Sequence, residues 1–288
     1  MKKTLYIVHQ NKMPRFFHCV RFAQLACEKV GCKLIVITNK ECSKILKPLG
    51  VTVELISEYE KYTIKDNYIH NSLHPEWYEL ISINRWLIIY ESMLKNDLSD
   101  CMTIDSDVLI LSENYFSIFD SNNFDFISPR HHHQSLISPG TTKLNLKSLK
   151  IFKRTVDKFY ESERLNRIYS DKIKMTSKDK NISDMNIWGD VFSNSFIPID
   201  HDLNNHFFEK TIQLHTSLVH YAPVEFKYDN NIWTYNDTDV EVLYLHCAGP
   251  LKHHIRTIAD FINSKQNFRI EQQGLTPKGH KNFIVKTL

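Results

Sequence analysis

The sequence predicts an α/β protein built around an open, mostly parallel β-sheet flanked by helices. Short apolar and β-branched runs alternate with segments of helical periodicity through the first 111 residues. This alternation is typical of units in which a helix connects two parallel strands. A chain of 288 residues with 42% hydrophobic content is long enough to bury one large core. We therefore expect a single domain spanning residues 1–288.

The first half of the chain supplies most of the predicted sheet. The strand patterns cover 5–8, 33–38 and 51–56, and the helical patterns begin at 16, 42 and 79. A polar, aromatic stretch at 58–77 is expected to be an irregular loop. The helix 79–95 leads into an apolar run at 101–104, which is the fourth predicted strand.

The second half is less regular. Strands are expected at 125–128, 141–146 and 238–245, and one helix is expected at 147–167. The charged stretch 172–181 is expected to be a solvated loop, and Ser183-Asp184 has the chemistry of a helix start. The sequence shows no internal repeat and no low-complexity linker.

Composition narrows the class of partner and the compartment. A formal charge of +3 is only mildly basic, so no nucleic-acid partner is expected. The six cysteines are scattered without a Cys-x-x-Cys pair, which favours reduced thiols and a cytoplasmic protein. The apolar run 5–8 is too short for an export signal, and no run reaches transmembrane length. Peripheral contact with a membrane stays open.

Asp105-Ser106-Asp107 interrupts two apolar runs, 101–104 and 108–111. Residues two apart in an extended segment project to the same side, so both carboxylates can face one cation. Oxygen ligands of this kind suit Mg²⁺ or Mn²⁺. The alternative is that the acidic pair simply marks a strand end and a turn.

A second group of polar residues follows the last predicted strand. His246 can offer a neutral imidazole to a metal, Gly249 permits a close backbone approach, and Lys252 can place a charge beside phosphate oxygens. Arg85 lies off the apolar face of its helix. Each residue has an ordinary alternative, such as a satisfied histidine or a solvated arginine. Taken together, two carboxylates, an imidazole and a lysine match the needs of a metal-bound nucleotide diphosphate.

These motifs resemble those of the GT-A glycosyltransferases, in particular the retaining family-eight group of glycogenin and galactosyltransferases. The Arg85-Trp86 helix before Asp105-Ser106-Asp107, and the later His-x-x-Gly-x-x-Lys, are similar to that family in order and type. Ser138-Pro139-Gly140 and Ser183-Asp184-Met185-Asn186 occupy the places of two further family motifs. Ser138 and Met185 depart from the family's asparagine and glutamine, and both positions border the donor sugar. The resemblance covers roughly residues 4 to 255.

The resemblance implies a Rossmann-like GT-A sheet and a role for each matching residue. Asp105, Asp107 and His246 would bind Mn²⁺ or Mg²⁺, and Asp184 would be the catalytic residue near the transferred sugar or hold one of its hydroxyls. Residues 1–111 would form the nucleotide-binding half, 112–260 the donor-sugar and acceptor half, and 261–288 a C-terminal tail. The residues expected to contact a UDP-sugar are Val8, His9, Gln10, Thr38, Asn39, Arg85, Asp105, Ser106, Gly140, Gly249 and Lys252.

The predicted function is metal-dependent transfer of a sugar from a nucleotide sugar, expected to be UDP-linked, to a hydroxyl of a glycan, lipid or protein, with retention. One alternative is a non-catalytic nucleotide-sugar binding module. Another is a sugar-nucleotide pyrophosphorylase, but the turn at 9–14 lacks the glycines that such an enzyme needs. His131-His132-His133 and the aromatic stretch 59–77 are interpreted either as loops over the cleft or as ordinary loops.

Overall fold

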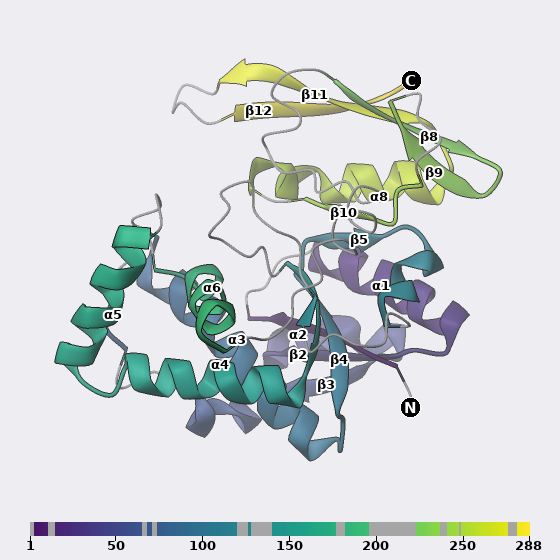
Figure 1. Ribbon diagram of the computed structural model, residues 1–288. Helices are drawn as coiled ribbons and strands as arrows, with labels where there is room; N and C mark the ends of the chain where they lie inside the picture. Colours follow the sequence, from purple (N-terminus) through teal and green to yellow (C-terminus); the bar gives the residue numbers. More distant parts are fainter. Residues whose placement is uncertain are drawn as a thin grey trace.

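The computed structural model describes residues 3–10, 15–64, 68–70, 74–119, 126–127, 140–176, 182–195, 223–236, 241–247, 249–275 and 281–288. Its largest sheet has the strand order β3-β2-β1-β4-β7-β6 (Figure 1). The pairs β3-β2, β2-β1 and β1-β4 are parallel, whereas β4-β7 and β7-β6 are antiparallel. The strands are β1 (Thr4–His9), β2 (Lys33–Thr38), β3 (Thr52–Leu55), β4 (Asp100–Ile104), β6 (Phe126–Ile127) and β7 (Thr141–Asn145).

Helices cover both faces of this sheet because side chains alternate between the faces along each strand. On β1, Tyr6 belongs to the apolar cluster that contains Trp86 and Trp188, whereas Leu5 and Ile7 pack with the helix that follows β1. The helices are α1 (Phe16–Val30), α2 (Lys40–Leu46), α3 (Glu76–Lys95), α4 (Leu146–Phe159), α5 (Glu163–Thr176) and α6 (Asp184–Ser195). The short 3₁₀ helices beside them are η1 (Lys47–Leu49), η2 (Ile56–Glu58), η3 (Glu60–Tyr62) and η4 (Glu113–Phe119).

A smaller layer packs beyond α1. Strand β5 (Val108–Ile110) pairs with β10 (Tyr244–His246), and η6 (Gly249–His254) leads into helix α8 (Ile255–Asn263). In Figure 1, α8 lies between these two strands and a four-stranded antiparallel sheet of order β12-β11-β8-β9. That sheet consists of β8 (Val224–Asp229), β9 (Ile232–Tyr235), β11 (Phe268–Leu275) and β12 (Lys281–Thr287). The stretch 261–288, expected as a C-terminal tail, therefore contributes the end of α8 and two strands of this sheet.

The predicted fold class is confirmed: the central sheet is mostly parallel and has helices on both faces. The prediction of a single helix at 147–167 is wrong, because the helical structure is interrupted between α4 and α5. The backbone N–H of Leu165 donates to the Ser162 hydroxyl at 3.3 Å, and the N–H of Asn166 donates to the Ser162 carbonyl at 2.9 Å. Ser162 thus caps the start of a new helix.

Two other boundaries differ from the prediction. The loop expected at 58–77 contains η3 and ends where α3 begins at Glu76, one turn earlier than expected. Of the strand expected at 238–245, the structure describes residues 241–245, and only Tyr244 and Leu245 of these belong to β10. The N–H of Val242 donates to the Trp233 carbonyl of β9 at 2.7 Å, whereas the Leu243 carbonyl accepts from Leu111 N–H at 2.9 Å and continues the pairing with the β5 segment.

All six cysteines are buried and none forms a disulfide. Within the residues that the structure describes, no helix combines the length and apolar character that a bilayer crossing requires. His131-His132-His133, Ser138 and residues 177–181 lie outside the described residues. The prediction of a loop at 172–181 is wrong for residues 172–176, which form the end of helix α5.

Candidate metal centre and its pocket

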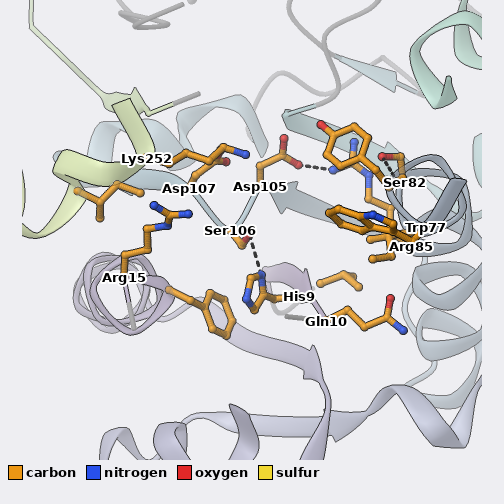
Figure 2. A pocket seen from close by; sticks show the side chains of 15 residues that line it. His9, Gln10, Arg15, Trp77, Ser82, Arg85, Asp105, Ser106, Asp107 and Lys252 are labelled. Carbon is orange, nitrogen blue, oxygen red and sulfur yellow. Dashed lines mark hydrogen bonds and ion pairs between the residues drawn. The ribbon is translucent and has the colours of Figure 1, made fainter. Parts of the chain in front are cut away.

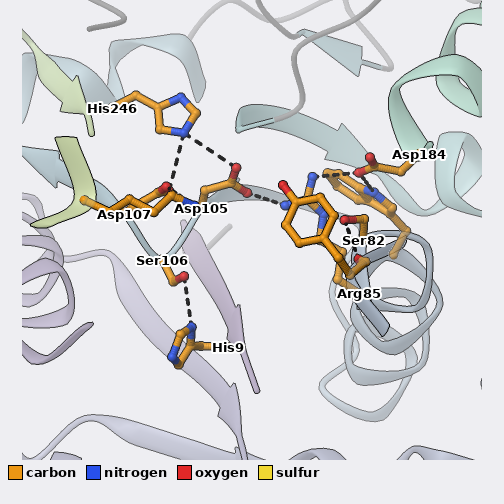
Figure 3. A network of polar contacts seen from close by, with 11 residues as sticks. His9, Ser82, Arg85, Asp105, Ser106, Asp107, Asp184 and His246 are labelled. Carbon is orange, nitrogen blue, oxygen red and sulfur yellow. Dashed lines mark hydrogen bonds and ion pairs between the residues drawn. The ribbon is translucent and has the colours of Figure 1, made fainter. Parts of the chain in front are cut away.

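The Asp-x-Asp segment lies in the turn between β4 and β5. Asp105 follows the last residue of β4, and Asp107 precedes the first residue of β5. The N–H of Val108 donates to the Asp105 carbonyl at 3.2 Å, which closes a tight turn around Ser106. The turn is further held from β1, because the Ser106 hydroxyl lies 2.9 Å from Nδ1 of His9 (Figure 3). Both carboxylates are therefore presented at the carboxyl ends of the central strands.

His246 reaches this turn through the pairing of β10 with β5. In the antiparallel register His246 lies opposite Val108, and the next N–H, of Cys247, donates to the Asp107 carbonyl at 2.9 Å. Its Nε2 lies 3.3 Å from Asp107 Oδ1 and 3.7 Å from Asp105 Oδ2. One potential ligand atom from each of the three side chains lies within 4.8 Å of the others. Two carboxylate oxygens and an imidazole nitrogen are a suitable donor set for Mn²⁺.

The charged side chains at this centre stabilise one another's ionised forms. Burial opposes ionisation of Asp107, but the neighbouring His246 and Lys252 outweigh it and hold the pKa of this carboxyl below its usual range. Burial likewise lowers the pKa of His246 and of Lys252, and Asp107 reverses the effect, so the pKa of both is raised. Lys252 Nζ lies 2.8 Å from Asp107 Oδ2. Asp107 is thus ionised and paired inside the protein, as a metal ligand must be.

Gly140 is packed directly against two of the candidate metal ligands. Its carbonyl accepts the backbone N–H of Asp105 at 2.8 Å, next to the first rung of the β4-β7 ladder. A Cβ atom added at Gly140 would lie 2.7 Å from His246 Cε1 and 3.1 Å from Asp105 Oδ2. Real Cβ atoms essentially never show a contact as short as the one to His246, and the one to Asp105 is tighter than most, so these ligands occupy the space that a side chain would fill.

Arg85, from α3, joins the metal centre to Asp184 at the start of α6. Its NH1 contacts Asp105 Oδ1, and its NH2 lies 2.7 Å from Asp184 Oδ2 (Figure 3). Trp86 Nε1 donates to the same Asp184 oxygen at 2.9 Å. Burial would lower the pKa of Arg85, but the two carboxylates raise it. The guanidinium is therefore a charged bridge between two carboxylates, and Asp184 is buried.

A pocket of about 150 Å³, partly open to solvent, lies in front of the Asp-x-Asp turn (Figure 2). It brings together eight of the residues predicted to bind the nucleotide or metal: Val8, His9, Gln10, Arg85, Asp105, Ser106, Asp107 and Lys252.

The other predicted residues lie behind or beside the side chains that line the pocket. The Thr38 hydroxyl donates to the His9 carbonyl at 2.6 Å, and Asn39 Nδ2 donates to the Gln10 carbonyl, so both support the pocket from behind. Gly249 is exposed and has a φ of 58° at the start of η6, where it turns the chain toward Lys252. Asp184 reaches the site through Arg85.

Several lining residues were not predicted from the sequence. Arg15 and Phe16 come from the start of α1, and Tyr78, Ile81 and Ser82 come from the start of α3. Trp77, in the aromatic stretch 59–77, also lines the pocket and is 55% exposed. The aromatic stretch that ends at Trp77 was the one signal available in the sequence. Arg15 had none, because nothing in its local sequence separates it from a surface arginine.

The architecture and the position of the site define the class of fold: it is the GT-A fold of glycosyltransferases. Mouse xyloside xylosyltransferase 1 in its apo form is similar, with a TM-score of 0.51 and 9% sequence identity. The match covers 85% of this chain and 97% of the mouse chain. At this identity the similarity concerns the fold.

Two further solved structures share the overall arrangement with TM-scores below 0.5. The galactosyltransferase LgtC, in complex with donor and acceptor sugar analogs, matches 91% of this chain and 96% of its own at 12% identity and a TM-score of 0.48. A glycosyltransferase involved in glycosylation of the major capsid of PBCV-1 matches 88% and 99% at 12% identity and a TM-score of 0.47. The sequence matches no protein-family model and no curated protein.

Proposed function

We propose that this protein is a metal-dependent glycosyltransferase that moves a sugar from a UDP-sugar to an acceptor hydroxyl with retention, as in family eight. The observation that carries the proposal is the convergence of Asp105, Asp107 and His246 in a GT-A fold, with both aspartates at the wall of a pocket. Residues 1–111 form the nucleotide-binding half in this proposal, and 112–260 serve the donor sugar and acceptor.

The residues present fit Mn²⁺ or Mg²⁺, because two carboxylates and an imidazole come within bonding range and Gly140 leaves room beside them. When bound, the cation stabilises negative charge on the departing diphosphate. Lys252 adds a point charge from the same side, beside Asp107. His9 holds Ser106, and thereby the turn that carries both carboxylates, in a fixed position. The uridine would lie against Val8 and Gln10, and Asp105 would also contact its ribose.

Asp184 is assigned to the sugar end of the reaction. Its Oδ2 atom accepts hydrogen bonds from Arg85 and Trp86, which fix the orientation of the carboxylate. In this arrangement Asp184 would hold a hydroxyl of the transferred sugar or lie near its anomeric carbon. The acceptor is a glycan, lipid or protein hydroxyl, and the enzyme is assigned to the cytoplasm.

The test is release of UDP from a panel of UDP-sugars by the full-length chain, with Mn²⁺ and then with EDTA. We expect turnover of at least one donor with Mn²⁺ and none with EDTA. Anomeric NMR of the product then reports retention. Metal-dependent thermal stabilisation of the protein by a UDP-sugar, without turnover in the presence of any acceptor, would favour the binding-module alternative. Formation of pyrophosphate from UTP and a sugar phosphate would favour the pyrophosphorylase.

A further inference from the structure

Among the described residues, three Lys or Arg side chains line the pocket, and two of them lie on one side of it. Arg15 and Lys252 lie to the left in Figure 2, and Arg85 lies to the right, beside Trp77 and Ser82. These cations differ in their partners. Arg85 bridges the carboxylates of Asp105 and Asp184, so its charge is balanced inside the protein. The family resemblance had placed Arg85 among the residues expected to contact a UDP-sugar.

Arg15 contacts the residue that follows Lys252 in the chain. Its NH1 lies 3.3 Å from Nδ1 of His253, a residue 238 positions away, and His253 directly follows Lys252 in η6. Lys252 Nζ in turn lies 2.8 Å from Asp107 Oδ2. Arg15 and Lys252 therefore form one cationic wall next to the candidate metal centre.

The start of α1 holds Arg15 at this wall. Phe16 is buried and its ring stacks on His9 with centroids 4.0 Å apart. Because His9 also contacts Ser106, the first residue of α1 is connected to the Asp-x-Asp turn. The first turn of α1 contains no acidic side chain, so the positive end of the helix dipole adds to the charge of Arg15.

We infer that Arg15 and Lys252 together bind the diphosphate of the nucleotide, and that Arg85 is a positioning residue for Asp105 and Asp184. This inference rests on the proposed function, since it requires a nucleotide diphosphate in the pocket. A diphosphate carries more negative charge than one lysine already paired with Asp107 can balance. A guanidinium is suited to complete the site, because its planar donors match phosphate oxygens in pairs.

Calorimetric titration of the full-length protein with UDP, UMP and uridine tests the inference, in Mn²⁺ and again in EDTA. Arg15→Gln should weaken UDP binding about tenfold, the size expected for one charged hydrogen bond. Uridine binding should change less than twofold. The loss should persist in EDTA, because the side chain and not the metal makes the contact. Arg15→Lys should retain part of the UDP affinity.

Arg21→Gln is the matched control, because Arg21 lies on the same helix, is exposed and does not line the pocket. It removes the same charge and should leave UDP affinity unchanged. Equal UDP affinity in wild type and Arg15→Gln would overturn the inference, and so would a parallel loss of UDP and uridine binding. Absence of UDP binding by the wild-type protein would instead contradict the proposed function. Thermal melts of each variant exclude unfolding as the cause.

Discussion

The two aspartates of the Asp-x-Asp turn face two different environments. The Asp107 carboxylate contacts His246 from β10 and Lys252 from η6. Asp105 meets Arg85 from α3, which also holds Asp184. Both environments combine carboxylates with cations at the end of the same sheet. They differ in what their cations contact.

The cation on the Asp107 side is the more open one, although Asp105 itself is more exposed than Asp107. The side chain of Lys252 is 35% exposed, whereas those of Arg85 and Asp184 are 18% and 5% exposed. The side chains of Asp105 and Asp107 are 26% and 9% exposed. The ion pair of Arg85 with Asp184 is largely buried, and breaking such a pair leaves its partner uncompensated. We expect the Asp107 side to exchange contacts when a ligand binds, and the Arg85 side to keep them.

The largest effect is expected from Asp107→Ala. Losing this carboxylate removes a candidate metal ligand and the partner of Lys252, so metal-dependent transfer should fall about 100-fold or more. The chain should remain folded, because Lys252 can extend into solvent. UDP release and Mn²⁺ titration measure the effect, with Asp157→Ala on the exposed surface of α4 as the control. Full activity in Asp107→Ala, or in wild type with EDTA, would contradict the metal mechanism.

Arg85→Met tests the Asp105 side of the comparison. It leaves buried Asp184 without its charged partner, so unfolding free energy should fall by about 3 kcal/mol, at the lower end of values for broken buried pairs. Asp105 retains access to water, which limits the loss. Urea denaturation measures it, and the double variant Arg85→Met/Asp184→Asn should recover part of the stability. Equal stability of wild type and Arg85→Met would show that the bridge does not fix the geometry.

Gly140→Ala sharpens the comparison, because the new methyl group would press on His246 and Asp105 from behind. We expect Mn²⁺ affinity to fall about tenfold and stability by about 1–3 kcal/mol, as for an overpacked site. Gly31→Ala is the matched control: Gly31 has a φ of 67° and open space around it, so alanine there strains the backbone only. A calorimetric Mn²⁺ titration in which Gly140→Ala and Gly31→Ala behave alike would reject a specific role for Gly140.

The smallest effect is expected from Trp86→Phe, which removes one hydrogen bond to Asp184 and keeps most of the buried ring. Arg85 still holds the same carboxylate, so turnover should fall only a few fold while stability falls by about 1–2 kcal/mol. Trp233→Phe, in the antiparallel sheet, should lower stability without changing the turnover number. A larger turnover loss in Trp233→Phe than in Trp86→Phe would reverse the expected order.

Much of the fold was predictable because its signals are local. The β-branched run of β2 and the apolar runs of β1 and β4 identify strands without any knowledge of their partners. The break between α4 and α5 was missed because apolar periodicity continues across it. Tyr160 is buried like the helical residues before it, and only the cap at Ser162 separates the two helices.

The candidate site was predictable where residue type and order carry its chemistry, as for Asp105, Asp107 and His246. Its contacts were not, because they depend on pairing between distant segments. The register of β5 with β10 places His246 beside Asp107. The crossing of α3 with α6 gives Arg85 a second carboxylate, and the packing of η6 against the start of α1 brings His253, the residue after Lys252, into contact with Arg15. No local sequence pattern predicts these contacts.

The place of Gly140 has a consequence for folding. Its carbonyl bonds the N–H of Asp105 beside the antiparallel pair of Ile104 with Thr141. If β7 paired with β4 one residue out of step, a threonine side chain would occupy the space that His246 and Asp105 need. A misaligned chain would keep its helices and most of its sheet and yet bind no cation. Cation binding would then measure correct strand alignment during refolding, which spectroscopic signals of helix and sheet content do not distinguish.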